Sequence, residues 1–173
     1  MPRVKPCTMP LDALLKRYQK SGFHSDCYST VIPFGVSFEQ FVGAFYSTRL
    51  FRLERFILKW VVSRPSTDAQ LARLASADDT NFAAWSVEDR AENQILLSDF
   101  QGRTRSWLMT ARMETDSGEQ TRLYFGSAIV PVLDKKSGEQ RLGFAYKALL
   151  GFHKLYSVAL LSSAAAGLVK KSR

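Results

Sequence analysis

The strongest constraint on the fold is a long apolar repeat close to the C-terminus. Apolar residues recur every three or four positions, the spacing of one face of a helix. They are Leu142, Ala145, Leu149, Phe152, Tyr156, Leu160 and Ala164. A helix with an apolar face of this length needs a large surface to pack against. Because only a sheet offers such a surface here, the repeat predicts a long helix lying along a sheet.

The sheet is expected between residue 81 and residue 132, where the helical spacing disappears. Turn residues there separate short runs in which apolar residues alternate or cluster, as they do in strands. We predict strands at about 82–90, 92–100, 103–114 and 120–132. The pair Gln101-Gly102 and the run 116–119 suit tight hairpin connections. The sheet is therefore predicted to be antiparallel.

The first half of the chain predicts one more strand and several short helices. A strand is expected over 26–33, after a short helix at 10–20. Ser37 and Gln40 have the spacing of a capping box, which predicts a helix with Phe38, Phe41, Val42 and Phe45 on one face. A second helix is expected up to about Val62. A third, capped by Thr67 and Gln70, is expected to carry Leu71 and Leu74.

Length and composition favour one globular domain, and the expected elements give it the α+β class, with five or more antiparallel strands gripping the C-terminal helix and two or three short helices after the first strand. The chain has 173 residues, of which 46% are hydrophobic and 23% are charged. We assign residues 1–25 to an N-terminal extension with a short helix and 26–170 to the domain. Oligomeric state is left open.

Cysteine usage and apolar run length bear on the cellular setting. Cys7 and Cys27 match no zinc-ligand spacing, so we interpret them as reduced thiols and expect neither a metal nor a cofactor. The run 158–169 is shorter than a membrane-spanning helix requires. We therefore expect a cytoplasmic protein without a transmembrane segment.

The order of elements resembles the helix-grip arrangement of the START-like superfamily, which includes polyketide cyclases and lipid-transfer proteins. The run 26–31 followed by 37–41 looks like that family's first strand and helix. The strands at 103–108 and 123–128 resemble its central sheet, and residues 152–156 resemble its gripping helix. The likeness is closest to uncharacterised bacterial branches. It implies a cavity between sheet and C-terminal helix that takes a small hydrophobic or aromatic ligand.

Six residues are candidates for contact with such a ligand. They are Trp85, Arg105, Trp107, Tyr124, His153 and Tyr156. His153 lies on the same helix side as Leu149 and Tyr156, so its ring can point toward the sheet. Its imidazole suits general acid–base chemistry, which keeps a cyclase or isomerase as an alternative function. The other interpretation of His153 is a hydrogen-bonded core residue.

A nucleic-acid or partner-binding domain is the third function considered. The net charge is +8, but the basic residues are scattered along nearly every segment. Arg105 and Arg122, interleaved with Trp107 and Tyr124 on adjacent strands, resemble a surface that stacks bases. We favour Trp107 as a core residue instead, and expect no specific nucleic acid.

Acidic residues offer no catalytic pair in the sequence. Glu88 and Asp89 are consecutive on a predicted strand, so they should face opposite ways, and we interpret them as exposed acids. His24 and Ser25 are likewise sequence neighbours on an extended chain. This arrangement disfavours a hydrolase.

Overall fold

The computed structural model describes residues 3–21, 23–51, 68–76, 80–82, 85–116, 118–130 and 144–172. Within them, seven strands form one antiparallel sheet in the order β1-β2-β7-β6-β5-β4-β3. The strands are β1 Lys5–Pro6, β2 His24–Ile32, β3 Asn81–Phe82, β4 Trp85–Ala91, β5 Gln94–Asp99, β6 Thr104–Thr115 and β7 Gly118–Ile129. The predicted α+β class is confirmed.

The hairpin turns lie where the sequence predicts them. Gly102 connects β5 to β6 with φ of 66°, and Gly118 opens β7 with φ of 108°. Both values lie in the region that L-residues with a side chain rarely adopt, so glycine is required for these turns.

Four helices surround the sheet in the described residues: α1 Lys16–Lys20, α2 Phe38–Tyr46, α4 Asp68–Ala75 and α5 Phe144–Lys171. The capping box of α2 is present. The Gln40 amide donates to Ser37 Oγ at 3.2 Å, and the Ser37 amide donates to Gln40 Oε1 at 2.9 Å. The second predicted helix, which ends at about Val62, falls mainly in residues 52–67, outside the described residues. Thr67, the predicted cap of the third helix, also lies outside them.

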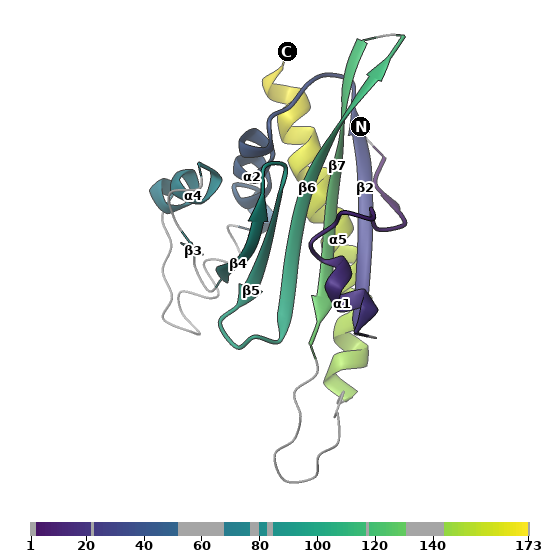
Figure 1. The fold of residues 1–173 in the computed structure, drawn as a ribbon, viewed down its shortest axis with the longest axis vertical. Coiled ribbons are helices and arrows are strands. Elements are labelled where there is room, and N and C mark those ends of the chain that lie inside the picture. The colour runs from purple at the N-terminus through teal and green to yellow at the C-terminus, as the bar shows by residue number, and fades with distance from the viewer. Residues whose placement is uncertain are drawn as a thin grey trace.

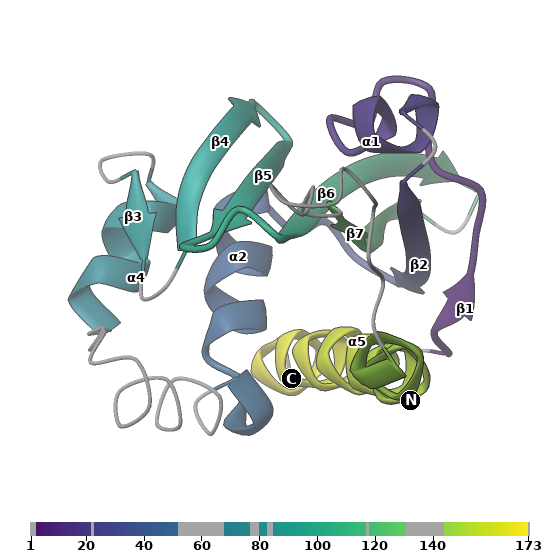
Figure 2. The same ribbon diagram turned by 90° about the horizontal axis from the view of Figure 1, so that it is seen from below.

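The two faces of the sheet are covered by different parts of the chain (Figures 1 and 2). We call the face toward α2 and α5 the helix face. We call the opposite face, covered by residues 9–18 including the start of α1, the N-terminal face. Side chains alternate between the two faces along β6 and β7, as the sequence predicts for these strands.

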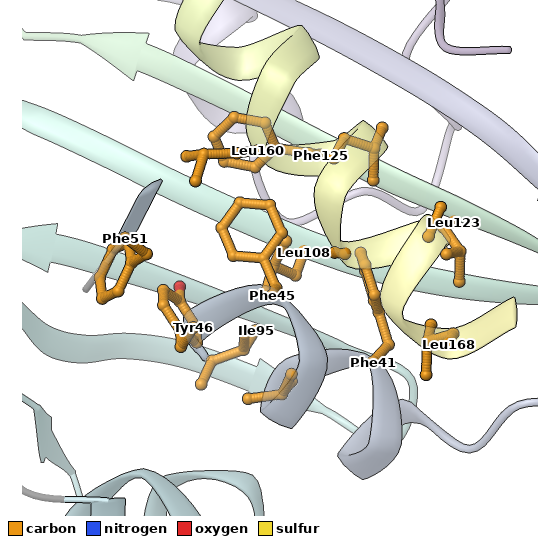
Figure 3. Close-up of a cluster of buried hydrophobic side chains, with 14 of the residues drawn as sticks. Phe41, Phe45, Tyr46, Phe51, Ile95, Leu108, Leu123, Phe125, Leu160 and Leu168 are labelled. Carbon is orange, nitrogen blue, oxygen red and sulfur yellow. The ribbon is translucent and has the colours of Figure 1, made fainter. Parts of the chain in front are cut away.

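The main core lies on the helix face. Phe45 of α2 packs against Phe125 of β7 with ring centroids 4.8 Å apart, and Leu160 and Leu168 of α5 contact the same cluster (Figure 3). Further members are Phe41, Tyr46, Phe51, Ile95, Leu108 and Leu123. In the described part of the C-terminal repeat, Leu160 and Ala164 are buried against the main core and Tyr156 is partly buried against it, as expected.

A second, smaller core lies on the N-terminal face. Its buried members are Met9, Ala13, Leu15, Cys27, Leu96, Trp107, Met109, Tyr124 and Ala128. The predicted helix at 10–20 is wrong in extent, because regular helix begins only at Lys16. Leu11, expected on its apolar face, is 89% exposed, whereas Leu15 is fully buried. The residues before Lys16 form turns that fit the sheet surface instead of a regular helix.

Candidate functional site

The contact between the sheet and α5 is closely packed where its side chains are described. Leu160, Leu161, Ala164, Ala165 and Leu168 are all buried against the main core. Along this part of α5 the side chains pack directly against core residues of the sheet and of α2. The first part of the helix, residues 144–153, includes His153, and the side chains of this stretch lie outside the described residues.

Three of the six candidate residues lie on the N-terminal face, opposite α5. Trp107 is fully buried, and its Nε1 donates to Gln94 Oε1 at 2.9 Å. Its ring lies 6.0 Å from that of Tyr124, which is also buried. Arg105 is on the same face and pairs with Glu88. These three residues therefore do not line a space between sheet and α5.

Trp85 and Tyr156 are on the other side, partly buried against the main core. The Trp85 indole Nε1 is buried, and no hydrogen-bond acceptor for it is found in the described part of the chain. The structure thus divides the five candidates whose side chains it describes between two faces and does not bring them together.

The base-stacking surface is excluded by the same geometry. Stacking requires exposed rings, but residues 9–18 cover Trp107 and Tyr124. Arg105 is neutralised by Glu88, and its Nε donates to Tyr18 Oη at 2.7 Å. The prediction that Trp107 is a core residue is confirmed. The element that covers it is the N-terminal segment, whereas α5 covers the opposite face.

Glu88 and Asp89 do not face opposite ways, because the strand register shifts between Val87 and Asp89. This irregularity brings both carboxylates to Arg17 of α1. The Arg17 guanidinium holds the pKa of the Asp89 carboxyl below its usual value. The expectation of opposite orientations is therefore wrong, and the two acids fasten α1 to the sheet.

Away from the six candidate residues, the described part of the protein has a groove of about 1070 Å³. Four segments line it: residues 36–39 at the start of α2, 75–76 at the end of α4, 90–93 around the β4–β5 turn, and 110–112 of β6. The groove is open to solvent. Its volume lies just above the usual range of about 300 to 1,000 Å³ for small-molecule sites, so we take it as the candidate functional site.

The groove lining mixes apolar, hydrogen-bonding and charged groups. Val36 and Phe38 contribute apolar surface. Asn93 is held in place because its Nδ2 donates to the Thr110 carbonyl at 2.9 Å, while the Thr110 amide donates to the Asn93 carbonyl at 3.0 Å. This double contact fixes the β4–β5 turn against β6, so that wall of the groove is preformed.

Charges of both signs lie around the groove. Arg90 and Arg112 are balanced in number by Glu39 and Glu92. The Arg90 guanidinium donates to the Leu74 carbonyl at 2.7 Å, and burial lowers its pKa from the ordinary value. That contact joins β4 to the end of α4, two of the elements that line the groove.

None of the six sequence candidates is among the described residues that line the groove. Its four segments are far apart in the chain, and no local pattern links them. The described lining also contains neither histidine nor cysteine. Across the described ranges, no group of His, Cys, Asp and Glu side chains is arranged to hold a metal ion.

Comparison with known proteins identifies no relative: no family model, no curated protein and no solved structure matches the chain. Among the helices that the structure describes, none has the length and hydropathy needed to cross a bilayer.

Proposed function

We propose that this protein binds a small molecule in the groove between α2, α4 and the β4–β5 turn. The observation that carries the proposal is the groove itself, about 1070 Å³ in volume and lined by both apolar and hydrogen-bonding side chains. Pockets for small ligands combine these features, with apolar walls for affinity and a few polar groups for orientation.

The lining indicates what kind of ligand fits. Val36 and Phe38 suit an apolar or aromatic group, while Asn93 and Thr110 add polar groups to the same lining. Because two arginines and two glutamates offset each other around the groove, a polyanion gains little from binding there. We therefore infer a ligand with an apolar body and a few hydrogen-bonding groups.

The helix-grip resemblance remains part of this proposal at the level of architecture. An antiparallel sheet with a long C-terminal helix packed on it agrees with that resemblance. The groove differs in location from the cavity that the resemblance implies, since it opens beside α2 and α4.

The proposal can be tested with a variant that fills the groove. Ala91 lines the groove and is exposed, so Ala91→Trp adds a large ring there without disturbing the core. Leu155→Trp is the matched control, because Leu155 is 74% exposed on α5, outside the groove lining. Native mass spectrometry of the purified protein and a thermal-shift screen of fatty acids, flavonoids and polyketides give the readout.

We expect a compound that raises the melting temperature of the wild type and of Leu155→Trp but not that of Ala91→Trp. Equal stabilisation of all three proteins would place the ligand elsewhere and contradict the groove proposal. A screen with no stabilising compound, together with a mass that shows no bound molecule, would count against small-molecule binding altogether.

A further inference from the structure

The pairing of β1 with β2 places the two cysteines side by side. Pro6 lies opposite Tyr28, and the next residue, Cys7, donates its backbone amide to the Cys27 carbonyl at 3.0 Å. The two Sγ atoms are 3.2 Å apart. Residues directly opposite in an antiparallel pair have Cα atoms about 4.5 to 5.5 Å apart, within the range that a disulfide spans.

The two thiols differ in surroundings. Cys27 is buried in the core of the N-terminal face, whereas Cys7 is partly exposed at the sheet edge. A hydrogen bond from the Cys27 thiol lowers the pKa of Cys7 to about 7, and Ser29 and Arg122 act in the same direction. The hydrogen bond with Cys7, then burial and the charge of Asp26, raise the pKa of Cys27. Cys7 is therefore the nucleophilic member of the pair.

We propose that Cys7 and Cys27 are a redox modification site in which hydrogen peroxide oxidises the two thiols to a disulfide. The Cys7 thiolate attacks one oxygen of hydrogen peroxide, the O–O bond breaks, and the leaving hydroxide takes a proton to become water. The Cys27 sulfur then attacks the Cys7 sulfenic acid. An S–S bond forms, the S–O bond breaks, and the hydroxide leaves as water with the Cys27 proton.

The disulfide would hold the N-terminal segment on the sheet. Apart from the two-residue strand β1, this segment is attached through the second core and through the hydrogen bonds of Gln94 with Leu14 and Asp12. Arg17 and Tyr18 add contacts with the two acids of β4. A bond from Cys7 to Cys27 closes a loop that contains α1. By restricting the unfolded chain, it stabilises the arrangement that covers Trp107.

Peptide mapping tests the site directly. The folded protein is treated with hydrogen peroxide, free thiols are blocked, and the protein is digested with trypsin. Cleavage after Lys16, Arg17 and Lys20 puts the cysteines in separate peptides, so a disulfide joins two peptides that a reductant separates. We expect this linked pair in the wild type, and a melting temperature about 5 to 10 °C higher that returns to its original value on reduction.

The matched control moves one thiol by a single position, in the double variant Cys7→Ser with Thr8→Cys. It keeps two cysteines but takes one out of the position opposite Cys27, so no linked pair is expected. Oxidation of wild-type Cys7 to sulfinic acid without a linked peptide would overturn the proposal. So would equal cross-linking of the control, or a linked wild type whose melting temperature does not rise.

Discussion

Gln94 joins the N-terminal segment to the sheet through a buried amide. Its Oε1 accepts from the Leu14 backbone amide and from Trp107 Nε1, both at 2.9 Å. Its Nε2 donates to the Asp12 carbonyl at 3.1 Å. These hydrogen bonds contribute to stability because their partners are buried away from water. If the Gln94 amide were removed, the partner groups would have no other hydrogen-bond partner in its place.

Replacing Gln94 with leucine should therefore destabilise the protein out of proportion to the change in size. Gln94→Leu leaves the Trp107 and Leu14 donors without an acceptor, and we expect a loss of about 2 to 4 kcal/mol in unfolding free energy. Urea unfolding measures it. Gln101→Leu, at an exposed turn position, is the control. Equal midpoints for the two variants would contradict the role of Gln94.

The N-terminal segment, residues 9–18, acts as a covering element although little of it is helical. Leu15 is fully buried, and its Cδ2 lies near the backbone of Gly126 in β7. Arg17 and Tyr18 then reach Asp89 and Glu88 on β4. The segment thus spans the sheet from β7 to β4, which a residue-by-residue helix assignment does not reveal.

Two leucines in this segment allow a comparison within one element. Leu15→Ala should lower the unfolding free energy by about 2 to 5 kcal/mol, because it removes a fully buried side chain and leaves a cavity. Leu11→Ala should change it by less than about 0.5 kcal/mol, since Leu11 is exposed. Denaturant unfolding of both variants checks this. A similar loss for both would support the regular helix that the spacing predicts.

Parts of the molecule that are distant in sequence approach one another closely at Gly126 of β7. A Cβ built there would lie 2.8 Å from the Asp26 carbonyl oxygen and from Leu15 Cδ2, and 3.0 Å from Trp107 Cε3. Strand β2, strand β6 and the N-terminal segment therefore all meet β7 at this point. Because one of these atoms is the backbone oxygen of Asp26, it cannot move aside as the end of a flexible side chain can.

Gly126→Ala should consequently cost about 1 to 3 kcal/mol of unfolding free energy through overpacking. Gly167→Ala is the matched control, because a Cβ at Gly167 in α5 meets no atom within 4 Å. That substitution should stabilise the protein by about 0.5 to 1 kcal/mol, the helix preference of alanine over glycine. Thermal unfolding of both variants should give shifts of opposite sign. A Gly126→Ala variant as stable as the wild type would contradict the close approach of these segments.

Local patterns in the sequence were sufficient for most elements. Alternation along β6 and β7, the Ser37–Gln40 capping box and the glycine turns at Gly102 and Gly118 each depend on neighbouring residues. Since backbone conformation and side-chain periodicity act over a few residues, these features can be predicted without tertiary information. The long apolar repeat likewise predicted a helix packed on the sheet.

What covers each face was decided only by the tertiary structure. Alternation places Trp107 and Leu108 on opposite faces but does not say that the N-terminal segment covers the first and α2 with α5 the second. The groove has the same origin, because it joins segments around Phe38, Arg90 and Thr110 that no local pattern connects. Packing between distant segments minimises exposed apolar surface over the whole chain, so it depends on all residues together and not on any short stretch.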